Sequence, residues 1–160
     1  MKRFLFLIIF GFYIDQGFSV EIVPLKNALK ATLGPVKAAA KKNMTQGGEK
    51  FEVYYDKNAP KKFAVVQRRI YPPNCTHTWV IGLDSSATVK DIRIVEYSCP
   101  HAKPATTPSY FEQYIGKGPA DAGSLKGSIS TVAKATGTCD LTTDAVIMSI
   151  KGVTDAKKSL

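Results

Sequence analysis

The sequence predicts a single α+β domain in which helices pack on an antiparallel sheet of about four or more strands. Apolar residues recur at helical spacing near both ends of the chain, and two pairs of strand-like runs lie between them. Short polar turns separate the runs within each pair, which favours antiparallel pairing of neighbouring strands. A length of 160 residues fits one domain with a buried core.

The first nineteen residues have the composition of a secretory signal peptide. Lys2 and Arg3 form a short positive region, and a nearly continuous apolar run follows from Phe4 to Ile14. Gly17 and Ser19 are small residues of the kind that a signal peptidase recognises. Because the apolar run is too short to span a bilayer comfortably, we expect cleavage after residue 19. Residues 20–160 would then be a soluble domain exported to a bacterial periplasm.

Helical spacing predicts the first element of this domain over residues 21–43, with an interruption at Gly34-Pro35. After a glycine-rich break, two strands are expected over residues 50–56 and 62–71. Residues 57–60, Lys-Asn-Ala-Pro, join these strands as a hairpin turn.

Two further strands flank the polar turn Asp84-Ser85-Ser86 within residues 75–99. Residues 100–108 contain three prolines and are expected to form an ordered loop. A short helix is expected over Ser109 to Ile115. The last helix is expected from Asp140, a good N-cap residue, to Val153.

The chain is basic, with a formal net charge of +9 at pH 7. Loss of the signal segment removes two positive charges and one negative charge, which leaves +8. The basic residues are scattered, whereas nucleic-acid binding would want them interleaved with exposed aromatic residues on one face. Export also argues against a nucleic acid, so none is expected as a partner. An anionic surface could be a partner, although solubility alone explains the charge. The sequence has no nucleophile elbow, no recognisable pair of catalytic carboxylates and no phosphate-binding glycine loop, so an independent enzyme is not expected.

Both histidines and two of the three cysteines lie in the second predicted hairpin, as Cys75-Thr-His77 and Cys99-Pro-His101. Side chains alternate along a strand, so Cys75 and His77 share one face. If the hairpin turn centres near Ala87, Cys75 lies roughly opposite Cys99. Both Cys-x-His pairs are therefore expected at the open end of one hairpin.

These residues have three interpretations at the level of the sequence. Opposed strand residues are close enough for a disulfide, which exported proteins retain. Thiolate and imidazole groups could instead hold zinc, copper or a haem iron, although the spacing matches neither a zinc finger nor a haem-attachment motif. The third interpretation is coincidence. The remaining cysteine, Cys139, needs a partner, a ligand role or a buried apolar site.

A second notable segment, ATGTCDLTTDAV, covers residues 135–146. Its small and hydroxyl residues lead directly into a predicted helix start, where free amides and the helix dipole attract anions. An ordinary capped helix explains the same residues and, by physical chemistry alone, is the favoured interpretation.

The chain from about Leu25 to Ile150 resembles the FMN-binding domains of exported electron-transfer proteins. Members of that family include the small flavin-carrying subunits of sodium-pumping and Rnf-type respiratory complexes and the nitrous-oxide-reductase regulator. The likeness lies in the order of LKNALKATLGPVKAA, FEVYYD, VIGLDSSATVKDIRIVEYS, YFEQYIGK and a small-residue motif before LTTDAV. The resemblance implies an FMN-binding-domain-like α+β fold and a role in electron transfer with FMN. It also implies a redox protein as partner, either membrane-associated or a cytochrome.

The resemblance places the family's Ser-Gly-Ala-Thr motif on Gly137 to Asp140. Family members carry FMN as a phosphoester on the last residue of that motif. Asp140 cannot form this bond, so the implied FMN is held non-covalently. The residues that the resemblance assigns to flavin binding are Cys99, Pro100, Gly137, Thr138, Cys139, Leu141, Thr142 and Thr143.

In the resembled fold Cys99 and Cys139 line one pocket, and Cys75 and His77 lie across the hairpin from Cys99. The resemblance therefore implies that all five Cys and His residues converge, which makes coincidence the least favoured interpretation. Three functions stay open: FMN-based electron transfer, a repurposed domain that binds haem or a transition metal, and a cofactor-free binding module closed by a disulfide from Cys75 or Cys139 to Cys99. The ligands in the second case would be Cys75, His77, Cys99, His101 and Cys139.

Overall fold

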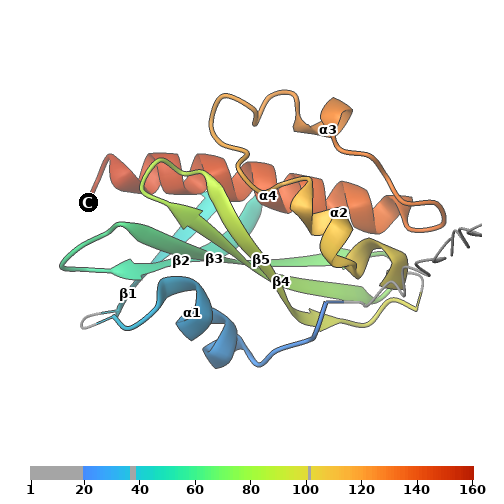
Figure 1. The fold of residues 1–160 in the computed structure, drawn as a ribbon, viewed down its shortest axis with the longest axis horizontal. Helices are drawn as coiled ribbons and strands as arrows, with labels where there is room; N and C mark the ends of the chain where they lie inside the picture. Colours follow the sequence, from blue (N-terminus) through green and yellow to red (C-terminus); the bar gives the residue numbers. More distant parts are fainter. Residues whose placement is uncertain (1–19, 37–38, 101) are drawn as a thin grey trace, which may run out of the picture.

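The computed structural model describes residues 20–36, 39–100 and 102–160 and has the predicted α+β architecture (Figure 1). Within these residues, five strands form one antiparallel sheet in the order β1-β2-β3-β4-β5, so that each strand pairs with its neighbour in sequence. The expected signal peptide and His101 lie outside the described residues. The elements are α1 Leu25–Leu33, β1 Ala39–Gln46, β2 Glu49–Asp56, β3 Lys62–Tyr71, β4 Cys75–Asp84, β5 Val89–Tyr97, the 3₁₀ helix η1 Lys103–Thr106, α2 Pro108–Glu112, α3 Leu125–Ser128 and α4 Thr136–Lys157.

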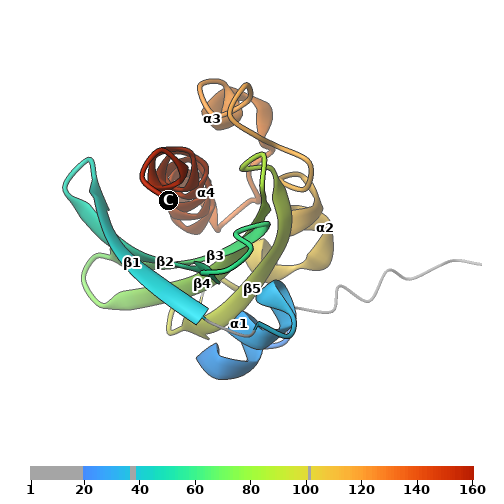
Figure 2. The same cartoon turned by 90° about the vertical axis from the view of Figure 1, so that its left-hand side faces the viewer.

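The sheet lies between α1 on one face and the long helix α4 on the other (Figure 2). Alternation along β4 directs Trp79, Ile81 and Leu83 into the larger core beneath α4, to which α2 and α3 also contribute. The smaller core, beneath α1, contains Ala64 and Val80. No helix of the described residues has both the length and the apolar character needed to cross a membrane.

Both predicted hairpins are confirmed. β2 and β3 cover residues 49–56 and 62–71, within one residue of the expected bounds. The turn between β4 and β5 is held by the Asp84 carboxylate, whose Oδ1 accepts from the amides of Ser86 at 2.8 Å and Thr88 at 3.0 Å. This is the usual reason for an aspartate at the start of such a turn.

The prediction of helix through residue 43 is wrong, because residues 39–43 belong to β1. Gly34 is the residue at which α1 ends, and its φ of +77° is a backbone conformation that favours glycine. β1 pairs with β2 along its whole length, and Lys41 Nζ lies 2.8 Å from Glu52 Oε1 across the pair. Alanine and lysine favour helix by only about a few tenths of a kcal/mol over most other residues, so the strand pairing decides.

The prediction that α4 starts at Asp140 is also wrong, because the helix begins at Thr136. The amide of Cys139 donates to the Ala135 carbonyl at 3.0 Å, which adds one turn before the aspartate. Asp140 is exposed within the helix and does not cap it. The short helix α2 is present but ends at Glu112, before the expected end.

Candidate functional site

The open end of the β4–β5 hairpin brings Cys75 and Cys99 together. The strand register continues beyond the last residues of β5, since the Ser98 amide donates to the Thr76 carbonyl at 2.9 Å. Cys75 and Cys99 therefore lie opposite each other, where the hairpin prediction placed them. The Cys75 thiol donates a hydrogen bond to the neighbouring Cys99 sulfur, and this bond, together with burial, raises the pKa of Cys75. Both cysteines are in the thiol form in this structure.

His77 is buried on the same face of β4, beneath the start of α4. Its Nδ1 lies 3.3 Å from the Cys75 carbonyl, and its Nε2 lies 3.2 Å from Thr138 Oγ1. The ring stacks on Trp79, with centroids 5.5 Å apart. Burial lowers the pKa of His77, although the hydrogen bond to the Cys75 carbonyl opposes the shift. A neutral ring that donates from Nδ1 and accepts at Nε2 satisfies both contacts.

Cys139 does not share a ligand set with the other described residues. Its sulfur accepts the Val132 amide at 3.4 Å, and the residue is fully buried in the larger core. Over residues 20–36, 39–100 and 102–160, no three His, Cys, Asp or Glu side chains are arranged to hold a metal ion. The described residues therefore bring together the Cys75 and Cys99 pair with His77 beside it, while Cys139 fills an apolar site.

The hydroxyl groups of Thr142 and Thr143, near the start of α4, form hydrogen bonds inside the protein. Thr142 Oγ1 donates to the Thr138 carbonyl and Thr143 Oγ1 to the Cys139 carbonyl, each at 2.8 Å. Threonine in a helix often forms this bond to the carbonyl four residues earlier. Both side chains are buried.

Two tyrosines extend this internal network. The Tyr114 hydroxyl lies 2.6 Å from the Tyr110 hydroxyl and 2.8 Å from Thr143 Oγ1, and Tyr110 also donates to the Cys139 carbonyl at 3.2 Å. Burial raises the pKa of Tyr114 to about 12 and that of Tyr110 further, so both hydroxyls stay protonated. The network ties α2 to α4 and is a structural reason for the hydroxyl residues.

These contacts do not fit a flavin phosphate at the position that the resemblance implies. A Cβ atom added to Gly137 would lie 2.4 Å from Cε2 of Tyr71, so the tyrosine ring fills the space beside this glycine. Thr142 and Thr143 direct their hydroxyl protons to helix carbonyls. Asp140 adds a negative charge to the same turn, which opposes a phosphate. Of the other residues that the resemblance implies, Pro100 is exposed and Leu141 lines a separate cleft.

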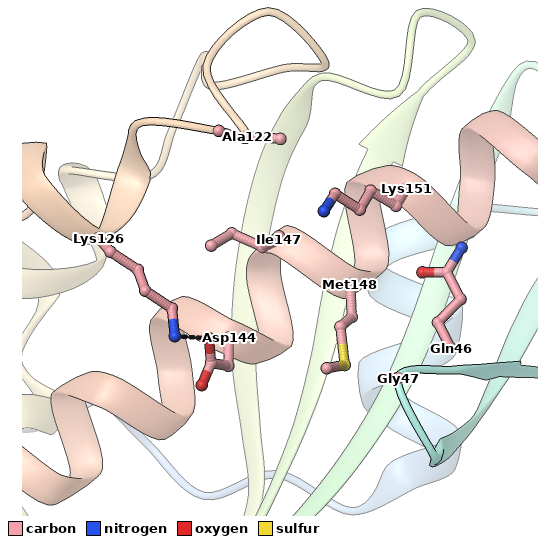
Figure 3. Close-up of a pocket in the computed structure, with 9 residues that line it drawn as sticks. Gln46, Gly47, Ala122, Lys126, Asp144, Ile147, Met148 and Lys151 are labelled. Atoms are coloured by element: carbon pink, nitrogen blue, oxygen red, sulfur yellow. Dashed lines mark ion pairs between the residues drawn. The ribbon is translucent and has the colours of Figure 1, made fainter.

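One pocket, of about 430 Å³, lies between α4 and the segment that carries α3 (Figure 3). Lys126 and Asp144 form an ion pair of 2.8 Å at one side of it. Met148 extends from α4 toward the turn at Gly47 (Figure 3). The acidic group of this pocket is therefore already paired, and Lys151 is a second basic group in its lining.

A second cleft, of about 540 Å³, was not expected from the sequence. Arg68 and Arg69 are consecutive in β3, so alternation must direct one of them to the face covered by α4. That is Arg69, which is 5% exposed. Two consecutive arginines in a predicted strand were the feature of the sequence that could have indicated a buried positive charge. The lining residues are Gly48, Glu49, Lys50, Arg68, Arg69, Ile70 and Leu141.

Comparisons with known proteins do not assign a family. No protein-family model, no curated protein and no solved structure matches the chain. The function is therefore inferred from the geometry of the chain itself.

Proposed function

We propose that this protein is an exported ligand-binding module on an FMN-binding-type scaffold, without a flavin at the position that the resemblance implies. The observation that carries the proposal is the Tyr71 ring against Gly137, which occupies the space beside the first turn of α4. The internal hydrogen bonds of Thr142 and Thr143 support it, because they leave no free hydroxyl proton for a phosphate.

The second part of the proposal is a disulfide between Cys75 and Cys99. The amide of Ser98 donates to the carbonyl of Thr76, so these two residues form a hydrogen-bonded pair of the two strands. Hydrogen-bonded and non-hydrogen-bonded pairs alternate, so Cys75 and Cys99, the next pair, form a non-hydrogen-bonded one. At such positions opposed Cα atoms are about 4.5 Å apart, within the range that a disulfide spans. This pair would fix the open end of the hairpin.

The bond forms by thiol–disulfide exchange with an external disulfide of an oxidising compartment. One cysteine thiolate attacks that disulfide and releases a thiolate, and the second cysteine then attacks the mixed disulfide. The two thiols lose two protons and two electrons, and the external disulfide is reduced to two thiols. A raised pKa of Cys75 is typical of a structural rather than a catalytic cysteine.

A second candidate function is electron transfer with non-covalent FMN and a redox protein partner. The order of the sequence motifs favours it, as does the first turn of α4, whose N-terminus has no side-chain cap to satisfy its free amides. For a flavin phosphate to bind there, Tyr71 would have to leave Gly137. Tyr71 is 46% exposed, so this movement is open to it.

The test is an absorption spectrum of the protein purified from the periplasm, followed by a thiol count in denaturant. We expect no flavin or Soret band and one reactive thiol, from Cys139, rising to three after reduction. Cys139→Ala should then show no thiol before reduction, and Cys75→Ser should show two.

A flavin spectrum released by acid would overturn the proposal in favour of the electron-transfer candidate. A Soret band, or stoichiometric metal with three unoxidised thiols, would favour the haem or metal alternative. N-terminal sequencing of the same sample should begin at Val20 if the export prediction holds.

A further inference from the structure

We propose that the cleft between β2 and β3 binds a small anion with an apolar body, such as an aryl carboxylate or phosphate monoester, and that Arg69 anchors the anionic group. This inference names the ligand class of the proposed binding module and in that sense rests on the proposed function.

The cleft exists because β2 and β3 separate toward one end. They pair only where residues 52–55 of β2 meet residues 63–66 of β3, although β2 begins at Glu49 and β3 continues to Tyr71. The gap of about 540 Å³ lies beyond the last pair and is closed on one side by Leu141 of α4. This volume is within the range of about 300–1,000 Å³ that is typical of small-molecule sites.

Arg69 supplies the main reason to expect an anion. Its side chain is 5% exposed, and burial lowers the pKa of its guanidinium. Nη1 donates to the Arg68 carbonyl at 3.0 Å and Nη2 contacts the Met148 thioether sulfur at 2.9 Å. A thioether is a weak acceptor, and a guanidinium has five donors. The buried cation is therefore poorly satisfied by these two contacts.

The charged groups around Arg69 leave room for a stronger counter-ion. The nearest carboxylate oxygen is Glu49 Oε2, 3.6 Å from Nη1, on a side chain that is 49% exposed. Asp144 contributes a more distant attraction. An arginine accepts a carboxylate or phosphate in a bidentate pair at about 2.7–2.9 Å, so a bound anion would surpass the existing contact.

The other residues that line the cleft favour a ligand with both a negative charge and an apolar body. Lys50 and Arg68 are exposed cations at the rim, so the cleft holds three basic groups and one acidic group. Two apolar residues line the cleft: Ile70, which follows Arg69 on the opposite face of β3 and is 59% exposed, and Leu141 of α4, which is partly exposed. Exposed apolar side chains next to a buried cation suit an aromatic or aliphatic body attached to the anion.

The test is calorimetric titration of the purified protein with phenyl phosphate, benzoate, inorganic phosphate and benzyl alcohol. We expect phenyl phosphate, benzoate or both to bind with a Kd below about 1 mM. Inorganic phosphate, which has no apolar body, and benzyl alcohol, which has no charge, should bind at least about tenfold more weakly. Amide shifts at Gly48 and Ile70 in an NMR titration would place the bound molecule in the cleft.

Three variants test the anchor. Arg69→Met should raise the Kd at least about tenfold, and Glu49→Gln should lower it about threefold or more because a competing carboxylate is removed. Lys103→Gln removes an exposed positive charge from a residue outside the cleft lining and should leave the Kd unchanged. If Arg69→Met does not fold, the Kd of Glu49→Gln, which is expected to be lower than that of the wild type, still tests the proposal.

The proposal is overturned if neither aryl anion binds. It is also overturned if Glu49→Gln leaves the Kd unchanged or raises it, or if Lys103→Gln raises the Kd as much as Arg69→Met does. Failure of the cleft proposal can be distinguished from failure of the proposed flavin-free function. A colourless, disulfide-bonded protein that binds no aryl anion would overturn the cleft proposal alone. A flavin-containing protein whose aryl-anion binding still depends on Arg69 would overturn the flavin-free function and keep the cleft.

Discussion

Arg69 and His77 are paired across β3 and β4, and both are buried beneath α4, yet their surroundings differ sharply. His77 meets a backbone carbonyl and the Thr138 hydroxyl, which suit a neutral ring. Arg69 cannot lose its charge, and its hydrogen bonds go to a carbonyl and a thioether. The contacts of His77 are thus satisfied inside the protein, whereas Arg69, on the same face of the sheet, has only weak partners and is the group that we propose binds an anion.

The difference separates a region of internal contacts from the region that we propose binds a ligand. Near His77 lie the apposed cysteines, for which we propose a disulfide, and the tyrosine–threonine network, which ties α2 to α4. Around Arg69, the separation of β2 from β3 leaves a charged cleft. Changes near His77 should therefore lower stability, and changes near Arg69 should alter binding.

The largest effect is expected from the cysteine pair. Replacing both Cys75 and Cys99 with serine should lower the free energy of unfolding by about 2–4 kcal/mol, because a cross-link that restricts the unfolded chain is lost. Urea unfolding under oxidising conditions measures this. Under reducing conditions the wild type should lose most of the difference. Equal stability of wild type and variant in oxidising buffer would show that the disulfide does not form.

Removal of one hydroxyl from the internal network should have the next largest effect. Tyr114→Phe leaves Tyr110 and Thr143 without a shared partner and should cost about 1–3 kcal/mol in the free energy of unfolding. Tyr97→Phe changes a partly buried tyrosine at the end of β5 and serves as the matched control. A small and equal effect of both changes would contradict a structural role for the network.

The hairpins were predictable from the sequence because alternation and turn residues act locally, as Asp84 shows by capping its own turn. β1 was missed because Ala39 and Ala40 lack a strand pattern and are held by pairing with β2. The start of α4 was missed for a related reason, since Thr138 and Cys139 join the helix through contacts with distant elements. Of the candidate site, apposition of the two cysteines followed from the register, whereas the cleft depends on where two strands separate.

Acidification should reveal the neutral state of His77. Its pKa is lowered in the folded state by burial, so the unfolded chain binds more protons as the pH falls below the ordinary value of 6.5. Stability from this residue is therefore present above pH 6.5 and is lost on acidification, by at most about 1.4 kcal/mol per pH unit. Urea unfolding at a series of pH values from 7.5 to 5.5 measures the slope. His77→Gln should flatten it, and an unchanged slope would contradict this assignment.

The smallest effect on stability is expected at Arg69. Without ligand, Arg69→Met should change the free energy of unfolding by less than about 1 kcal/mol, because an apolar side chain of similar size replaces a poorly paired buried ion. Thermal unfolding with and without phenyl phosphate measures this. Only the wild type should be stabilised by the ligand. If Arg69→Met lowered the free energy of unfolding by several kcal/mol in the absence of ligand, Arg69 would have a structural role, as His77 does.

Native mass spectrometry of the protein purified from the periplasm tests the central claim most directly, since one spectrum reports the chain, its oxidation state and any bound cofactor. The account predicts a chain that begins at Val20, lighter than the reduced form by two hydrogen atoms and free of flavin, haem and metal. A species heavier by one FMN, or a fully reduced chain with a bound metal, would contradict it.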